Sequence, residues 1–200
     1  MPKFASLTVQ KYLRELGSNK AVPGGGSAAA LAGALGAACS LMVANFSVKK
    51  QKTGETKEQL AKLTQALKKL IPQITKVVDD DPKVFAKVEK CYGIQRQADT
   101  EGKKKAARML MDQALSEAFQ VQAKLALLIN MALRVNKDLE PLASGSVKND
   151  LNVSESLLKG AFDGAVSTCE INLVYLSDTK KKEDLRRELD RLKHEFKVLV

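Results

Sequence analysis

Apolar residues recur at intervals of three and four along most of the chain, which is the spacing of one face of an amphipathic helix. One such stripe runs through residues 57–78, where Pro72 is expected to kink or split the helix. A shorter helix is predicted to begin at Asp81 and Pro82, because Asp accepts hydrogen bonds from free backbone N–H groups and Pro suits the first helical position. Gly93 is its predicted end. The pattern therefore predicts two successive helices in this region.

The same spacing predicts three further helices in the second half of the chain. A long helix is expected over residues 103–137, before Pro141 and the loop ASGS at 143–146. Another is expected over residues 150–175. The last has a narrow apolar stripe flanked by charges, which suits packing along another helix, within a bundle or across a dimer. This stripe consists of Leu185, Leu189, Leu192 and Phe196.

The stretch PGGGSAAALAGALGAACSLMVANF at residues 23–46 contains no charge and has no polar face. A membrane span is one interpretation, but most positions are Ala, Gly or Ser, which gain little from lipid. We favour a helix surrounded by others, on which Gly33 and Gly36 allow close approach of neighbouring helices. No convincing strand is visible elsewhere. The prediction is an all-α bundle of about five or six helices around this central Ala/Gly-rich helix, with residues 1–200 as a single domain.

A glycine loop precedes this helix. Gly24, Gly25 and Gly26 provide backbone that turns freely and approaches a ligand without a Cβ clash, and Ser27 is the expected N-cap. The free N–H groups and the positive end of the helix dipole then form an anion site for phosphate or carboxylate. A plain Gly-rich turn capped by Ser explains the same residues. The local pattern leaves both interpretations open.

The chain has 33 Lys and Arg against 23 Asp and Glu, a formal net charge of +10, so its surface should attract anions. Its lysines are dispersed and aromatic residues make up only 4% with no Trp, which argues against nucleic acid as the partner. The three cysteines, Cys39, Cys91 and Cys169, are far apart and predicted to be buried reduced thiols. Because the first twenty residues lack a signal-peptide pattern, we expect a cytoplasmic protein.

Three consecutive carboxylates, Asp79, Asp80 and Asp81, form an acidic cluster in which like charges could raise one pKa toward neutrality. On local rules Asp81 is a helix cap before Pro82, and Asp150 has the same capping interpretation after the 143–146 loop. His194 is alone in a charged helix and is expected to be solvated. The cluster lacks His partners and a calcium-loop pattern, so no metal is predicted.

The segment PGGGSAAALAGALGAACSLMV resembles the signature of the cyclodeaminase/cyclohydrolase family of folate enzymes. The resemblance continues in DDDPKVFAKVEKCYG and in VKNDLNVSESLLKGAFDGAVSTCEINL, and it covers most of residues 5–175. Four places depart from the family pattern. They are IQR at 94–96, Asn149 in place of Ser, Thr168 and Cys169 in place of an Asn-Val pair, and Gln122 where a proline is expected.

The resemblance implies an all-helical, dimeric enzyme of one-carbon metabolism. Asp81 matches the acidic residue thought to act in catalysis, Asp150 matches a late Asp of the family, and the loop from Gly24 to Ser27 is implied to bind substrate. The implied activity is a formiminotetrahydrofolate cyclodeaminase, which makes 5,10-methenyltetrahydrofolate and ammonia. The alternatives are a methenyltetrahydrofolate cyclohydrolase and a non-catalytic folate-binding or scaffold bundle. No cofactor beyond the folate substrate, whose tail can be polyglutamylated, is expected.

Overall fold

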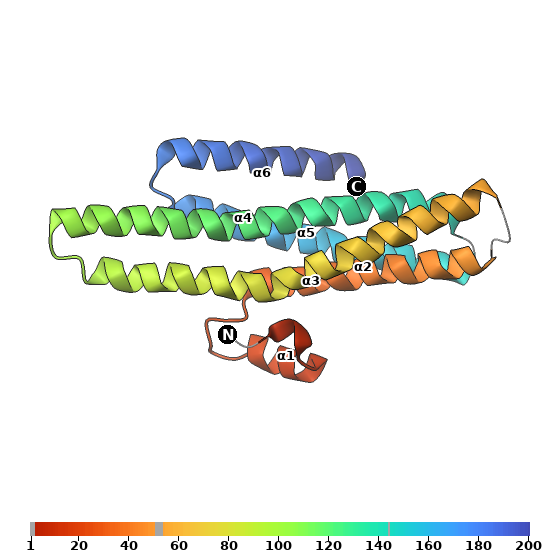
Figure 1. Cartoon of the computed structure of the whole chain (residues 1–200), viewed down its shortest axis with the longest axis horizontal. Coiled ribbons are helices and arrows are strands. Elements are labelled where there is room, and N and C mark those ends of the chain that lie inside the picture. Colours follow the sequence, from red (N-terminus) through yellow and green to blue (C-terminus); the bar gives the residue numbers. More distant parts are fainter. Residues whose placement is uncertain (1–2, 51–53, 144) are drawn as a thin grey trace.

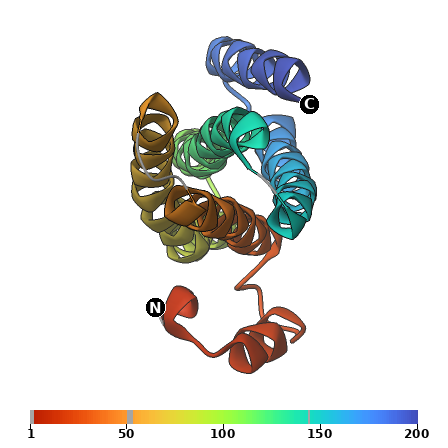
Figure 2. The same cartoon turned by 90° about the vertical axis from the view of Figure 1, so that its right-hand side faces the viewer.

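The computed structural model describes residues 3–50, 54–143 and 145–200, which contain six α-helices, three short 3-10 helices and no strand. In order, they are η1 (Phe4–Ser6), α1 (Val9–Leu16), α2 (Gly25–Lys50), α3 (Glu55–Arg96), α4 (Glu101–Leu139), η2 (Glu140–Leu142), η3 (Ser146–Lys148), α5 (Asn149–Tyr175) and α6 (Thr179–Leu199). Helices α2 to α5 run side by side in one long bundle, while α1 and α6 lie on opposite outer sides of it (Figures 1 and 2). The predicted all-α bundle is confirmed.

Helix α2 packs tightly against its neighbours through its glycines. A Cβ at Gly33 would lie 2.4 Å from Cδ1 of Ile129, and one at Gly36 would lie 2.8 Å from Cγ of Leu158. This confirms the predicted close approach. By length and apolar composition α2 is able to cross a membrane, and 56% of its apolar window is buried in the bundle. It is not enclosed all round, however, because one edge is exposed to solvent. That edge includes Leu35, Met42 and Phe46.

The prediction of two successive helices in this region is wrong. Helix α3 is one helix that runs without interruption through Pro72 and Pro82. A proline has no N–H, so Pro82 leaves the carbonyl of Val78, four residues earlier, without its helical partner. Ser27 of α2 supplies the missing donor, with its Oγ 2.9 Å from the Val78 oxygen. The helix therefore continues past Asp81 and Gly93, and Asp81 is not an N-cap.

The remaining helices lie close to the expected ranges. Helix α6 packs mainly on α4, and its predicted stripe is turned toward the bundle: three leucines are buried, and the Phe196 ring stacks on Phe162 of α5 with centroids 3.9 Å apart. His194 on the same helix is exposed, as predicted. Residue 144 of the predicted 143–146 loop and residues 1–2 of the N-terminal region lie outside the described part of the chain.

The three cysteines are free thiols, as expected. Cys91 and Cys169 are buried and Cys39 is half-buried. Burial is the main reason that the pKa of the Cys169 thiol is raised to about 12. This thiol therefore stays protonated and unreactive at neutral pH.

Candidate functional site

A cavity of about 270 Å³, here called the Asp81 cavity, opens where the N-terminus of α2 meets α3, α4 and the end of α5. Its walls are mostly apolar, and Asp81 is the one charged side chain among the described residues that line it. The lining residues are Ala21, Val22, Gly24, Gly25, Gly26, Asp81, Val84, Phe85, Val88, Tyr92, Leu115, Ala118, Thr168, Ile171, Asn172 and Tyr175. The structure thus brings the three loop glycines and Asp81 together.

Two protein groups hold the carboxylate of Asp81. Nε2 of Gln122 on α4 donates to Oδ1 at 2.7 Å, and the backbone N–H of Ser27 donates a second hydrogen bond. Burial of the carboxyl raises its pKa, and these two bonds oppose that rise without cancelling it. Asp81 therefore accepts a proton at a higher pH than an exposed aspartate does, which suits a group that transfers protons.

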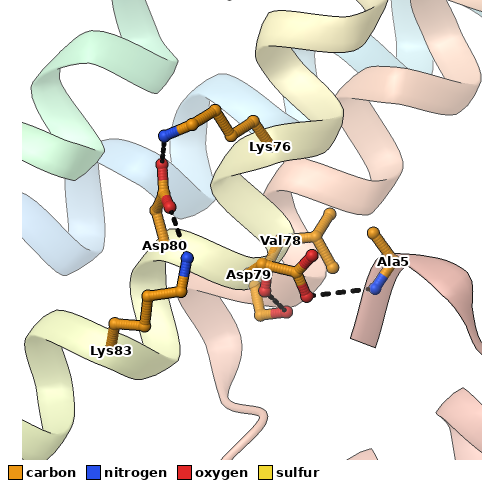
Figure 3. Close-up of polar contacts among 7 residues, drawn as sticks. Ala5, Lys76, Val78, Asp79, Asp80 and Lys83 are labelled. Atoms are coloured by element: carbon orange, nitrogen blue, oxygen red, sulfur yellow. Dashed lines mark hydrogen bonds and ion pairs between the residues drawn. The ribbon is translucent and has the colours of Figure 1, made fainter. Parts of the chain in front are cut away.

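The predicted cluster of three carboxylates does not form, because successive residues of a helix point in different directions. Asp80 turns outward between Lys76 and Lys83, with Oδ1 3.0 Å from the Lys83 ammonium, and Asp79 accepts from the Ala5 N–H at 3.2 Å (Figure 3). Although partial burial raises the pKa of Asp80, the two lysines hold it below its usual value. The shifted pKa of Asp81 thus comes from burial and not from like charges.

Ser27 is placed differently from the prediction. Helix α2 begins at Gly25, so Ser27 lies in its first turn and is not the N-cap. Its fully buried Oγ donates to Val78 and lies 3.0 Å from the Tyr12 hydroxyl, which must donate in turn because the Ser27 proton is already used. The Ser27 side chain therefore supports the cavity from behind, and its backbone N–H faces Asp81.

An anion site was one of the two interpretations left open for this helix N-terminus, and the anion found there is the protein's own Asp81. The fit is so close that any residue other than glycine at position 26 would force these side chains to shift. A Cβ there would lie 2.2 Å from Nε2 of Gln122 and 2.3 Å from Oδ1 of Asp81. At Gly25, by contrast, a Cβ would meet nothing within 4 Å. Of the three glycines, Gly26 is the one that allows the carboxylate and the helix to meet.

Asp150 is not part of this arrangement. It lies in the first turn of α5, whereas α5 contributes Thr168 and Asn172 from its other end to the Asp81 cavity. At about 1.5 Å per residue, roughly 30 Å of helix separates them. Asp150 instead acts on the thiol of Cys39. Burial is the main cause of the raised pKa of Cys39, and the charge of Asp150 raises it further. The structure therefore does not bring the two candidate carboxylates together.

The role of Gln122 was not predicted from the sequence. This residue was noted only because it stands at a position where the family pattern has a proline. The signal was available: Gln122 is a polar residue within the buried stripe of α4, and its side chain is fully buried. A buried amide on an otherwise apolar stripe needs hydrogen-bond partners from another helix. Here that partner is Asp81.

The mouth of the Asp81 cavity carries exposed apolar and aromatic side chains, including Phe85, Tyr92, Ile171 and Tyr175. Such a rim suits a flat, partly aromatic ligand whose polar end reaches a proton-transferring carboxyl. Among the described residues, no group of three or more His, Cys, Asp or Glu side chains is arranged to hold a metal.

A larger and more open groove of about 1000 Å³ lies between α3 and α4, beside α6. Among the described residues that line it, the one acidic side chain is Glu195, on the C-terminal half of α6, and the groove is bordered by Lys62, Lys69 and Arg134. We place the candidate site in the smaller cavity because it encloses a buried, hydrogen-bonded carboxyl with a raised pKa, which is the stronger mark of a functional site.

The formiminotransferase-cyclodeaminase family model matches residues 8–191. The chain is 28% identical to formimidoyltransferase-cyclodeaminase of Gallus gallus over 93% of its own length, and it spans 34% of that protein. It is 27% identical to methenyltetrahydrofolate cyclohydrolase of Methylorubrum extorquens, covering 92% of this chain and 88% of that one. The fold matches formiminotetrahydrofolate cyclodeaminase of Thermotoga maritima with a TM-score of 0.85 at 21% identity, over 97% of this chain and 92% of that one.

Proposed function

The chain belongs to the formiminotransferase-cyclodeaminase family, and we propose that it is a one-carbon enzyme that makes or breaks a bond between a one-carbon group and a tetrahydrofolate nitrogen. The first candidate activity is formiminotetrahydrofolate cyclodeaminase, which forms 5,10-methenyltetrahydrofolate and releases ammonia. The observation that carries the proposal is the buried carboxyl of Asp81, hydrogen-bonded and raised in pKa, inside a mostly apolar cavity.

One such carboxyl is sufficient for the proton transfers of this reaction. The second folate nitrogen attacks the formimino carbon, a tetrahedral centre forms, and the C–N bond to the departing ammonia breaks. When the reaction starts from the protonated formimino group, the proton lost by the attacking nitrogen has to reach the leaving nitrogen, and the methenyl cation and ammonia form with no net gain or loss of protons. Asp81 can accept that proton as the carboxylate and donate it as the acid, and the cavity walls hold the reacting groups in place. Its raised pKa favours the donating step.

A second candidate activity is methenyltetrahydrofolate cyclohydrolase. It is supported by the similarity to the Methylorubrum extorquens relative, of which this chain covers 88%. The chain spans about a third of the vertebrate relatives. In that reaction Asp81 would take a proton from the attacking water and return a proton to the folate nitrogen that leaves. A folate-binding bundle without catalysis is the third candidate.

Other roles in the proposal follow from the resemblance. Gly24, Gly25 and Gly26 would let the folate approach the N-terminus of α2, and dispersed lysines would bind the carboxylates of a polyglutamylated tail. Asp150 remains a predicted catalytic residue, although it lies outside the Asp81 cavity. We further propose a cytoplasmic homodimer that needs no metal or additional cofactor. Light scattering of the purified chain tests the dimer.

The test offers both folate substrates and records ammonia release together with methenyl absorbance. Asp81→Asn should abolish turnover while the helical circular dichroism spectrum stays unchanged. The matched control is Asp80→Asn, which removes the neighbouring carboxylate on the outer face and should keep activity. Full activity of Asp81→Asn would refute the assigned role. Folate binding with no turnover of either substrate by the unmodified chain would support the non-catalytic candidate instead.

A further inference from the structure

Gln122 is a fully buried polar side chain beside the candidate site. None of its surface is exposed to solvent, and its Nε2 lies 2.7 Å from Oδ1 of Asp81. Its other amide atom, Oε1, is also buried and has no hydrogen-bond partner among the described residues. Leaving a buried acceptor unpaired is unfavourable, so its persistence beside a functional carboxyl calls for a physical reason.

The chemistry of the two groups supplies one. An ionised carboxylate can only accept hydrogen bonds, and it needs the N–H of the amide. A protonated carboxyl is a donor, and it needs the amide oxygen. A glutamine side chain offers both atoms at nearly the same position, because half a turn of the amide group exchanges N and O. Asp81 must change between these two forms if it carries a proton during the reaction.

We propose that Gln122 is a positioning residue that partners Asp81 in both of its protonation states. Nε2 donates to the carboxylate, and after the amide turns over, Oε1 accepts from the carboxylic acid. Only the O–H bond of Asp81 forms or breaks in this exchange, and the proton comes from or goes to the reacting molecule. The inference rests on the proposed role of Asp81 as the proton carrier. It explains the unpaired oxygen and assigns a function to a residue that departs from the expected proline.

Few other groups act on Asp81. From α2 the Ser27 N–H donates to it, from α1 the Tyr12 phenol lies behind Ser27, and α5 presents the uncharged Thr168 and Asn172 to the same cavity. On α3 itself, Asp80 is bound by lysines on the outer side. Gln122 is therefore the side chain whose replacement should change the titration of Asp81 most directly.

The first measurement follows the titration of Asp81 by carbon-13 NMR of its carboxyl, identified by its loss in Asp81→Asn. Gln122→Met keeps the side-chain length but removes both amide atoms. It should raise the titration midpoint by about one pH unit, because the hydrogen bond lost from the charged carboxylate is stronger than the one lost from the acid. The acidic limb of kcat/KM, which reports groups of the free enzyme, should shift upward by the same amount. The matched control is Gln120→Met, which removes an exposed bond from the same helix to Glu188, 2.9 Å away, and should shift neither.

The second measurement follows the side-chain N–H₂ signals of Gln122 in the unmodified protein. They should shift with the same midpoint as Asp81, because Nε2 loses its carboxylate partner when the acid forms. Gln122→Glu offers a further variant: two carboxyls at this distance share one proton and should titrate in two separated steps.

An unchanged Asp81 midpoint in Gln122→Met, or a single unshifted step in Gln122→Glu, overturns the inference. Gln122 amide signals that stay constant through the Asp81 titration overturn the exchange of the two amide atoms. If Gln122→Met does not fold, the amide signals and Gln122→Glu still decide the question. Both titrations need no folate, so a protein that turns over neither substrate would refute the proposed function without changing how these results are interpreted.

Discussion

Replacing Gly26 by alanine tests the geometry of the site most directly. The added methyl group would lie 2.2 Å from Nε2 of Gln122, 2.3 Å from Oδ1 of Asp81 and 2.8 Å from its Cγ. These are the two ends of one hydrogen bond, and the Gln122 end is completely buried. The pair therefore has little room to move aside together, and the methyl group must separate the two side chains or push α2 away from α3.

The expected loss of stability is the difference between two terms. Overpacking of this kind costs about 1–3 kcal/mol. Alanine recovers about 0.5–1 kcal/mol because it is favoured over glycine inside a helix. Taking the middle of each range, the net effect of Gly26→Ala is a destabilisation of roughly 1 kcal/mol, which for a chain of this size lowers Tm by about 2–4 °C.

Gly25→Ala is the matched control for stability, since a Cβ at Gly25 meets nothing within 4 Å. Thermal unfolding of the two variants beside the unmodified protein is the assay. Gly25→Ala should leave Tm unchanged or slightly higher, whereas Gly26→Ala should lower it and also lose turnover. Equal Tm values for the two variants, or full activity of Gly26→Ala, would show that the helix and the carboxylate do not meet as described.

Three further predictions concern the surrounding bundle and pH. Ser27→Ala should cost about 1–3 kcal/mol by leaving the Val78 carbonyl unpaired, and denaturant unfolding should show a smaller cost in a Pro82→Ala background, where the helical N–H is restored. Gly36→Leu should lower Tm markedly, because even a Cβ there is too close to α5; an unchanged melting curve contradicts the packing. Burial raises the folded pKa of Asp81, so the folded state binds more protons than the unfolded chain and loses stability as pH rises through this window. Asp81→Asn should therefore raise Tm relative to the unmodified protein more at pH 8 than at pH 4, and the reverse order would contradict the pKa shift.

The sequence was sufficient for the features that depend on local spacing. Three- and four-residue periodicity predicted the later helices closely, and the glycines of α2 predicted close helix packing. The meeting of the glycine loop with Asp81 was not predicted, since nothing in the spacing between positions 26 and 81 encodes their contact.

The features that were missed all depend on partners far away in the sequence. Local rules predict that a helix ends at a proline, but α3 continues through Pro82. Ser27, which is 51 residues from Val78 in the sequence, donates a hydrogen bond to the Val78 carbonyl that Pro82 leaves unpaired. Local rules also group Asp79, Asp80 and Asp81, although their different directions on the helix give them different surroundings. Gln122 could be noticed as a polar residue on an apolar stripe, but its partner could be identified only from the packed structure.

The bond from Ser27 to the Val78 carbonyl also has a consequence for how the sequence can change over time. Proline at position 82 is tolerated because position 27 carries a hydroxyl, and the hydroxyl is useful because proline leaves the carbonyl free. Neither change is favourable alone, so the two positions should be inherited as a pair. Homologues that lose one should also have lost the other, and such paired replacements would report this contact from sequences alone.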